Sequence, residues 1–311
     1  MNILITGGCG FIGRALLKIL KNKHSVTVIG SFRKCSKEDF QLFIKKNGIS
    51  KCKIIAGELA LNIERLLHFD CVIHISENTN VQNSIDNPKE VFDYNLRTTF
   101  LLLDWCRRNK VHFVYPSTAL VYATPDKSGK ITEKSDVKPT CPYAAYKLAI
   151  EGIALSFYYT YNLPVTIFRI FNPYGPHQRA DEGAIANMLS RKKNKEKVII
   201  YGKGLQRRDF LFADDLAYLI SKSIGNKKAY GQIFNAGYGK DISIKDLAFL
   251  IAGSKKDIEF RKHLHPKNEI KRLICDNNKA KKILGWSPKI NIKEGVKRFD
   301  NWLMQKNINT K

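Results

Sequence analysis

The sequence has no apolar run long enough to cross a membrane as a helix. Its longest runs, such as Val111–Tyr115 and Val165–Phe171, are far shorter than the roughly 20 apolar residues that a bilayer-spanning helix requires. Residues Met1–Ile5 also lack the basic stretch, apolar core and cleavage site of a secretory signal. We therefore expect no membrane partner and a cytoplasmic location.

The seven cysteines include no Cys-x-x-Cys pair, and their number is odd. Zinc sites and disulfide frameworks both rely on paired cysteines at regular spacings. The pattern predicts no metal site and no disulfide framework, and it favours a reducing compartment.

Acidic residues are scarce: 28 stand against 53 Lys and Arg, for a formal net charge of +25. This charge would suit a nucleic acid, an acidic membrane surface or a phosphorylated small molecule. The cations are spread along the chain, in stretches such as Arg191–Lys197 and Lys279–Lys282, as is typical of solvated helix faces. We expect no nucleic-acid partner, although the positive field would attract a diphosphate.

Strand-like apolar runs alternate with helical patterns through the first half of the chain. The strand-like runs are Asn2–Thr6, Ser25–Ile29, Lys53–Ala56, Cys71–Ile75 and Val111–Tyr115, and the helical patterns include Ala15–Leu20 and Tyr94–Arg107. Runs of this kind are typical of strands buried on both faces, and parallel strands need a helix to return the chain. The sequence predicts an α/β fold, a doubly wound parallel sheet of the Rossmann type.

A turn-rich break at Asn172–Pro176 follows the strand-like run Val165–Ile170. Shorter elements come after it: a helix near Ala184–Lys192, a strand at Val198–Tyr201, and helices from Asp214 or Asp215, from Ser243 and from Lys293. We predict a dinucleotide-binding Rossmann domain over residues 1–171. Residues 172–311 are expected to form mainly a smaller, interleaved substrate-binding lobe, with some segments returning to the first domain.

Three glycines, Gly7, Gly10 and Gly13, stand between the first strand and the first helix. In dinucleotide-binding folds such glycines permit a tight turn, a close approach of the backbone to the pyrophosphate, and close packing of the helix on the sheet. The strand-loop-helix context is the one that this motif requires. It predicts that the loop binds a dinucleotide.

The acidic residue that ends the second strand in NAD-binding versions of this motif is missing. Gly30 and Ser31 follow the strand, and Arg33 and Lys34 come next. A small turn with two cations suits the 2′-phosphate of NADP. The sequence therefore leaves NADP and NAD both open as cofactor and favours NADP.

Tyr143 and Lys147 lie four residues apart in a helical pattern and so share one helix face. A phenol is a poor base at neutral pH unless a nearby cation favours the phenolate, and Lys147 can supply that cation. Ser117 and Thr118 follow the strand Val111–Tyr115 and therefore lie at the edge where open α/β sheets bind ligands. A hydroxyl there can relay a proton to the phenolate.

Segments along nearly the whole chain resemble the extended short-chain dehydrogenase/reductases, the nucleotide-sugar epimerase/dehydratase family. They include Gly7–Gly13, Val114–Tyr122, Tyr143–Glu151, Arg169–Pro176 and Tyr201–Asp215. The resemblance implies an NAD(P)-dependent enzyme that holds a nucleotide diphosphosugar in the cleft between two lobes. It also implies a homodimer.

The resemblance assigns roles residue by residue. Thr118, Tyr143 and Lys147 match the catalytic residues. The implied cofactor-binding residues are Gly7, Gly10, Phe11, Ile12, Gly13, Ser31, Arg33, Lys34, Glu58, Leu59, Asn95, Tyr143 and Lys147, and the implied substrate-binding residues are Ser84, Thr118, Asn172, Arg208 and Arg272.

The chain departs from the family pattern at four places, of which Ala123, after Tyr122 where Gly is usual, is the smallest. Ala119-Leu120 stands where dehydratases of the family carry acidic residues, which argues against a 4,6-dehydratase. Glu77 stands near the cofactor, where relatives keep small residues. His265-Pro266 replaces the family's Arg-Pro, so that Arg272 is expected to supply the phosphate contact.

Two enzymatic hypotheses remain open. A C4 epimerase keeps its cofactor and returns hydride to the other face of the sugar, whereas a 4-ketoreductase consumes NADPH. We favour the epimerase. A third hypothesis, from another class, is a catalytically silent relative that binds RNA through its basic surface.

Overall fold

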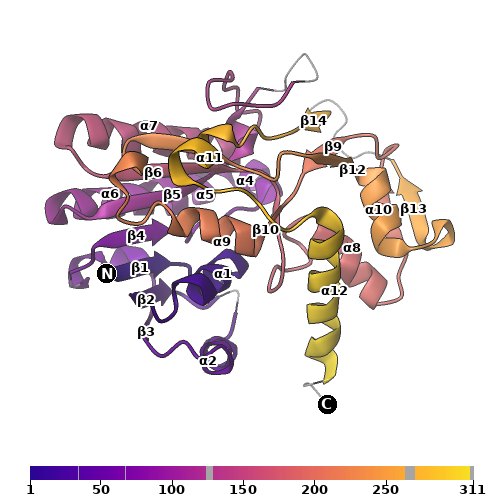
Figure 1. Ribbon diagram of the computed structural model, residues 1–311, viewed down its shortest axis with the longest axis horizontal. Coiled ribbons are helices and arrows are strands. Elements are labelled where there is room, and N and C mark those ends of the chain that lie inside the picture. The colour runs from indigo at the N-terminus through magenta and orange to yellow at the C-terminus, as the bar shows by residue number, and fades with distance from the viewer. Residues whose placement is uncertain (34, 67, 124–128, 263–269, 309–311) are drawn as a thin grey trace.

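Seven parallel strands form the central sheet of the protein, whose computed structural model describes residues 1–33, 35–66, 68–123, 129–262 and 270–308 (Figure 1). The strand order is β11-β6-β5-β4-β1-β2-β3. The strands are β1 (Asn2–Thr6), β2 (Ser25–Gly30), β3 (Cys52–Ala56), β4 (Cys71–His74), β5 (His112–Thr118), β6 (Val165–Ile170) and β11 (Gln232–Ala236). This confirms the predicted doubly wound parallel α/β fold.

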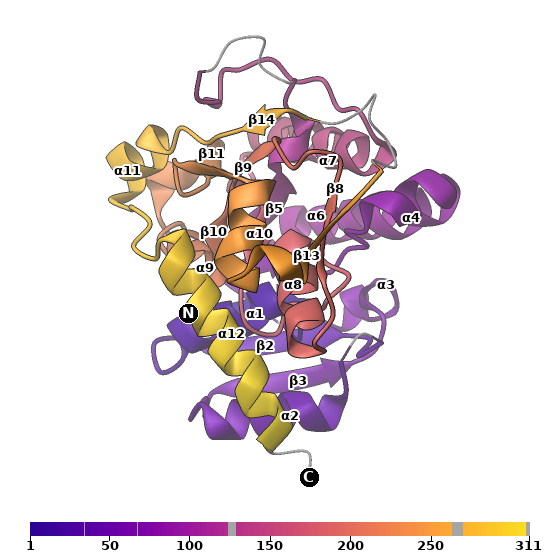
Figure 2. The same ribbon diagram turned by 90° about the vertical axis from the view of Figure 1, so that its right-hand side faces the viewer.

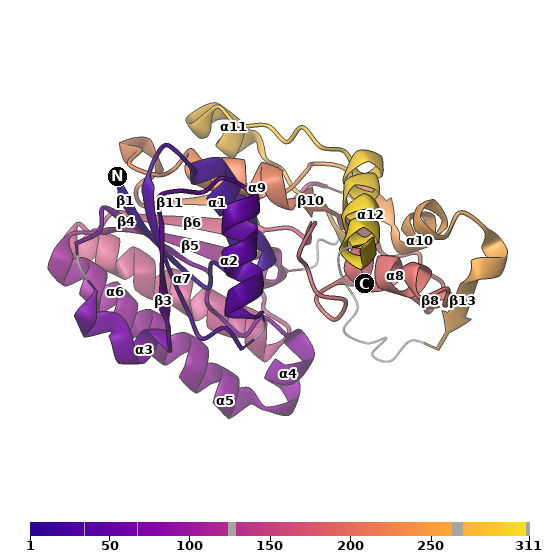
Figure 3. The ribbon, with the colours of Figure 1, turned by 90° about the horizontal axis from the view of Figure 1, so that it is seen from below.

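Alternate residues of the strands feed two cores, one on each face of the sheet. Ile3 and Ile5 of β1 belong to one core, and Leu4 belongs to the other. The first core is covered by α1 (Phe11–Leu20), α2 (Lys37–Lys46), α9 (Ala213–Ser221) and α11 (Asn278–Leu284), and the second by α3 (Leu59–Asn62), α6 (Thr98–Asn109) and α7 (Pro142–Tyr161) (Figure 3). Burial on both faces explains why these strands are apolar throughout.

The strand order reverses between β1 and β4, which are neighbours in the sheet. The chain moves outward from β1 to β2 and β3, then returns to place β4 on the other side of β1, with Thr6 opposite His74. In open α/β sheets, ligands bind outside the carboxyl ends of the strands at such a switch point. The topology therefore places the candidate site beyond Thr6 and His74.

The helix predicted over Tyr94–Arg107 begins differently from expectation. A π-helical turn, η2 (Asp93–Arg97), precedes α6, and short helices α4 (Val81–Asp86) and α5 (Pro88–Phe92) lead into it. Asn95 in this turn is buried, and its amide accepts from the N–H of Asn78 (2.9 Å) and donates to the carbonyl of Asn78 (3.0 Å). The turn thus holds the segment that follows β4.

The smaller lobe is built from α8 (Ala184–Lys193), β8 (Val198–Tyr201), α10 (Ile244–Ala252), β13 (Ile258–Arg261) and α12 (Ile292–Ile308) (Figure 2). Short strands connect it to the sheet: β7 (Pro173–Tyr174), β9 (Arg207–Asp209), β10 (Leu211–Phe212), β12 (Asp241–Ser243) and β14 (Arg272–Leu273). Three later segments belong to the sheet region, since β11 pairs with β6, α9 packs on α1 and α11 covers the first core. The boundary between residues 171 and 172 stays a prediction.

None of the helices in the described ranges combines the length and the apolar character needed to cross a membrane.

Two buried histidines make the stability of the fold depend on pH. Burial lowers the pKa of His74 to about 4 and that of His112 to about 3, whereas an unfolded histidine has a pKa of about 6.5. The stability that depends on these neutral rings is present above pH 6.5 and is lost as the pH falls toward 4. We expect urea unfolding to show a free energy of unfolding lower by several kcal/mol at pH 4.5 than at pH 7.

Single substitutions separate this effect from the general acid response. The His112→Gln variant should lose less stability between pH 7 and pH 4.5 than the wild type does. His68→Gln serves as the control, because the His68 side chain is 77% exposed. Equal acid losses in the His112→Gln variant and the wild type would contradict the expectation.

Candidate active site

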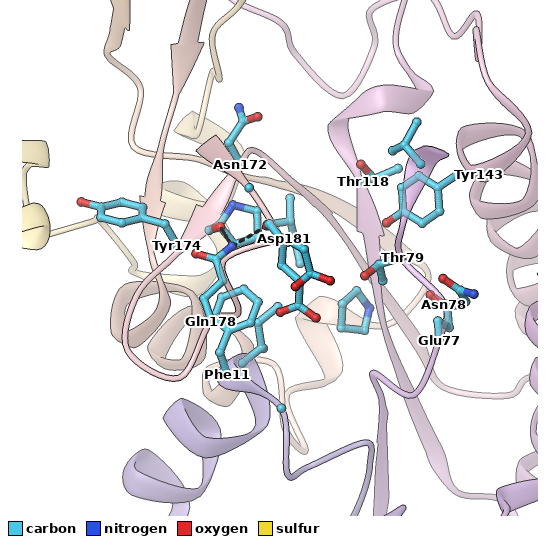
Figure 4. A pocket seen from close by; sticks show the side chains of 18 of the residues that line it. Phe11, Glu77, Asn78, Thr79, Thr118, Tyr143, Asn172, Tyr174, Gln178 and Asp181 are labelled. Carbon is cyan, nitrogen blue, oxygen red and sulfur yellow. Dashed lines mark hydrogen bonds between the residues drawn. The ribbon is translucent and has the colours of Figure 1, made fainter. Parts of the chain in front are cut away.

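A cavity of about 960 Å³ opens at the carboxyl ends of β1, β4 and β5 and extends to the smaller lobe. Thr118 and Tyr143 lie on one wall, with Glu77, Asn78 and Thr79 beside them. Phe11, Gln178 and Asp181 lie on the facing wall (Figure 4). The cavity coincides with the topological switch point of the sheet.

The glycine loop has no room for side chains at two of its positions. Gly7 has a φ of +69°, and a Cβ there would lie 2.9 Å from the Cα of Ser76. A Cβ on Gly13 would lie 2.4 Å from the Cα of Gly8. The α1 helix opens after Gly10 with no side-chain cap, so its first N–H groups face the loop. These features fit a pyrophosphate at the helix N-terminus, and Phe11 and Ile12 line the cavity next to it.

The cavity is also lined by Gly30, at the end of β2, and by the three residues that follow it, Ser31, Phe32 and Arg33. The Arg33 side chain is 73% exposed and forms an ion pair with Glu58, 2.8 Å between Nη2 and Oε1. Glu58 therefore contacts Arg33, a residue that lines the cavity, whereas the adjacent Leu59 is buried in the core. Neither of the two belongs to the described residues that line the cavity. Lys34, His265 and Pro266 lie outside the described residues.

The three predicted catalytic residues lie together. Thr118 ends β5, while Tyr143 and Lys147 lie on successive turns at the start of α7. The Thr118 hydroxyl lies near enough to the Tyr143 phenol to affect its pKa, and both oxygens point into the cavity (Figure 4). The Tyr143 side chain is otherwise enclosed, because the residue is only 8% exposed.

The environment of Tyr143 favours the protonated phenol. Burial raises the pKa of Tyr143 well above its usual range, the negative charge of Glu77 raises it further, and the nearby Thr118 hydroxyl lowers it. The Lys147 Nζ atom lies 6.0 Å from the centre of the Tyr143 ring. The Tyr143 hydroxyl can therefore donate a proton at neutral pH. It must lose that proton and become a phenolate before it can accept one.

Glu77 was not predicted as a site residue. Its carboxylate forms an ion pair with Lys147 and accepts a hydrogen bond from the Tyr115 hydroxyl, 2.7 Å. A signal for it exists in the sequence, because Glu77 follows a buried parallel strand at the edge that binds ligands. Gln178, Asp181 and Tyr174, which line the cavity from the segment after β6, carried no such signal.

The predicted substrate-binding residues divide into two groups. Thr118, Asn172 and Arg208 line the cavity. The Asn172 side chain donates to the carbonyl of Asp209 (2.8 Å), and the Arg208 guanidinium donates to the carbonyl of Arg207 (3.0 Å). Both side chains are thus tied to β9.

Ser84 and Arg272 are not among the described residues that line the cavity. Ser84 is fully buried, accepts from the Tyr143 N–H (3.1 Å) and so holds the first turn of α7. Arg272 donates to the Asp241 carboxylate, 2.6 Å. The ligand contacts assigned to all the site residues stay predictions. In the described ranges, the His, Cys, Asp and Glu side chains form no group of three that could hold a metal ion.

The comparison with protein families identifies the family of the chain. The sequence model of the NAD dependent epimerase/dehydratase family matches residues 3–237. The chain belongs to this family. The match includes the glycine loop, Thr118, Tyr143 and Lys147, and it confirms the resemblance drawn from the sequence. NAD(P)-dependent chemistry on nucleotide sugars is the activity of this enzyme family.

Several known proteins resemble the chain over nearly its whole length. The UDP-glucuronate 4-epimerase of Thermodesulfobacterium geofontis is 31% identical, over 96% of this chain and 95% of that protein. Pal from Bacillus thuringiensis superposes with a TM-score of 0.92 at 37% identity, over 98% of this chain and 100% of Pal. A UDP-glucuronic acid 4-epimerase mutant from Bacillus cereus, solved with UDP-4-deoxy-4-fluoro-glucuronic acid and NAD, superposes with a TM-score of 0.88 at 27% identity, over 98% and 100% of the two chains.

Proposed function

We propose that this chain is a nucleotide-sugar C4 epimerase that works with a bound nicotinamide dinucleotide. The observation that carries the proposal is the joint placement of the Thr118 and Tyr143 hydroxyls in one cavity with the glycine loop that precedes α1. The UDP-sugar 4-epimerases among its relatives support the choice of C4.

The chain's own residues would handle the proton. Tyr143, as the phenolate, removes the proton from the sugar 4-hydroxyl, and Thr118 holds that hydroxyl by a hydrogen bond. A dinucleotide held by the glycine loop, Ser31 and Arg33 would supply reversible hydride transfer at C4. Once the ring of the 4-keto sugar has turned its other face to the dinucleotide, Tyr143 gives the proton back to the oxygen at C4. The product is the sugar with inverted configuration at C4. Protons and electrons balance over the cycle, so that no second substrate is consumed.

The residues after Thr118 support epimerisation over dehydration. A dehydratase needs an acid-base group that removes a proton from the sugar ring and protonates the leaving hydroxyl. Ala119 is buried and Leu120 is apolar, and neither side chain can transfer a proton. The reaction proposed here therefore stops at the inversion of C4.

The second candidate is an NADPH-dependent reduction of a nucleotide 4-keto sugar. It is supported by the turn after β2, where Ser31 and Arg33 line the cavity and the carboxylate typical of NAD binding is missing. An exposed ion pair such as Arg33–Glu58 contributes only about 0–1 kcal/mol, so a 2′-phosphate can compete for the guanidinium. We therefore propose NADP as the preferred dinucleotide.

Purified protein incubated with UDP-sugars distinguishes the candidates. The proposed epimerase interconverts the C4 epimers with no added cofactor, and mass spectrometry of the denatured protein finds the dinucleotide it carried. Stoichiometric loss of NADPH with a 4-keto sugar would replace the proposal by the reductase. Salt-sensitive RNA binding without turnover would favour the silent relative.

We further propose a homodimer in a reducing cytoplasm. Support for the dimer comes from exposed apolar side chains on α6 and α7, namely Phe100, Leu101, Tyr159 and Tyr161. Support for the cytoplasm comes from the seven cysteines, all of which are free thiols. Sedimentation equilibrium should give about twice the chain mass of 35.5 kDa, and a mass equal to that of one chain would exclude the dimer.

A further inference from the structure

Glu77 places a buried carboxylate directly against the ammonium of Lys147. The two side chains are 2% and 4% exposed. Lys147 also donates to the carbonyl of Pro116, 2.6 Å, and Tyr115 donates to the other oxygen of Glu77, 2.7 Å. Lys147 and Glu77 therefore each have two polar partners. These partners come from β5, from α7 and from the segment after β4.

This arrangement determines where the positive charge lies. The Lys147 Nζ atom lies 4.4 Å from the centre of the Tyr115 ring and 6.0 Å from the centre of the Tyr143 ring. Removing one partner of a buried ion pair leaves an uncompensated charge, which is strongly unfavourable. The pair therefore holds the ammonium on the side of Tyr115.

Among the remaining titratable groups near Tyr143, three are neutral and one is a second carboxylate. His74 on β4 is neutral because burial lowers its pKa to about 4. Burial raises the pKa of the Cys141 thiol, which precedes α7, and that of the Tyr115 phenol. Glu90 of α5 and Tyr94 of η2 line the cavity, and Glu90 would add a charge of the same sign as Glu77.

We propose that Glu77 is a positioning residue for the reaction at Tyr143. It holds the Lys147 ammonium and offsets its charge, so that Tyr143 rests as the phenol and becomes a base only when a cationic ligand adds positive charge to the cavity. The inference rests on the proposed function for its catalytic meaning. The physical claim is that the Glu77 carboxylate disfavours the phenolate of Tyr143. This claim concerns only residues of this chain.

The test follows the ionisation of Tyr143 by NMR of protein labelled at the tyrosine Cζ carbon and saturated with oxidised NADP. The Tyr143 resonance is assigned by its loss in Tyr143→Phe. We expect Glu77→Gln to lower the midpoint of Tyr143 deprotonation by about one to two pH units. The acidic limb of the pH profile of kcat/KM should move in the same direction by the same amount.

Two control variants separate charge from structure. Glu151→Gln alters another buried pair, with Arg169, one helical turn from Lys147, and should leave the Tyr143 midpoint unchanged. Tyr115→Phe keeps the carboxylate and removes one of its hydrogen bonds, so it should leave the midpoint close to that of the wild type. A role for Glu77 in packing alone predicts a loss of stability in Glu77→Gln with no movement of the midpoint.

A second pair of variants is available if Glu77→Gln does not fold. Lys147→Met leaves the Glu77 charge alone in the cavity, and adding Glu77→Gln to it removes both charges, which buried pairs tolerate better. The double variant should show a midpoint below that of Lys147→Met. The proposal for Glu77 is overturned if Glu77→Gln has the midpoint of the wild type and the double variant has the midpoint of Lys147→Met. A shifted midpoint in a protein that turns over no nucleotide sugar overturns the proposed function alone.

Discussion

The Tyr143→Phe variant should lose roughly 10³-fold in kcat for C4 epimerisation, within the range that a positioned acid-base group contributes. The substitution removes one oxygen, the group that exchanges a proton with the sugar 4-hydroxyl. The ring stays in place, because Tyr143 is held by its own backbone N–H to Ser84 and by burial. Dinucleotide binding should remain close to that of the wild type.

The measurement is a steady-state comparison with Tyr146→Phe as the matched control. Tyr146 lies on the same helix, and its hydroxyl donates to the carbonyl of Pro88 (2.7 Å) instead of facing the cavity. Tyr146→Phe should keep nearly full activity. Similar activities for Tyr143→Phe and the wild type would show that another group transfers the proton, and thermal unfolding would exclude a trivial loss of folded protein.

The Gly13→Ala variant should weaken dinucleotide binding by roughly 100-fold, which corresponds to about 2.7 kcal/mol. The new Cβ would lie 2.4 Å from both the Cα and the carbonyl oxygen of Gly8. These are backbone atoms, so α1 has to move away from the loop and its N–H groups leave their positions at the pyrophosphate site. The same strain should lower the free energy of unfolding by about 1–3 kcal/mol.

Gly152→Ala provides the matched control, because Gly152 is also helical and a Cβ there would meet nothing within 4 Å. That variant should bind the dinucleotide as the wild type does and gain about 0.5–1 kcal/mol of stability. Binding is measured by isothermal titration calorimetry and stability by urea unfolding. Wild-type affinity in Gly13→Ala would show that the dinucleotide does not depend on this loop.

Local patterns account for the parts of the site that the sequence predicted. The glycine loop could be recognised because its three glycines, a strand and a helix are consecutive in the chain. Tyr143 and Lys147 could be paired because helical geometry places residues four apart on one face. Thr118 could be added because parallel strands bring their carboxyl ends to one edge, and the structure places its hydroxyl beside Tyr143.

Contacts between segments that are distant in the sequence could not be predicted from local patterns. Arg33 was interpreted as a cation facing a 2′-phosphate, and the structure pairs it with Glu58, which follows the neighbouring strand β3. Ser84 was expected at the substrate, a contact that stays a prediction, and the structure shows that it supports the backbone of Tyr143 from α4. In each case the deciding fact is which side chain a neighbouring element presents, and periodicity within one segment does not contain it.

The sequence by itself determined the doubly wound sheet, the glycine loop and the grouping of the candidate acid-base residues, because each depends on spacing within one or two consecutive elements. Only the tertiary structure decided how the charge of Lys147 is used. Glu77 is 70 residues away in the chain, and the pairing of β4 with β5 together with the packing of α7 on β5 brings its carboxylate to the ammonium. Electrostatic interactions depend on distance in space and on burial, and both are set by the packing of the whole fold.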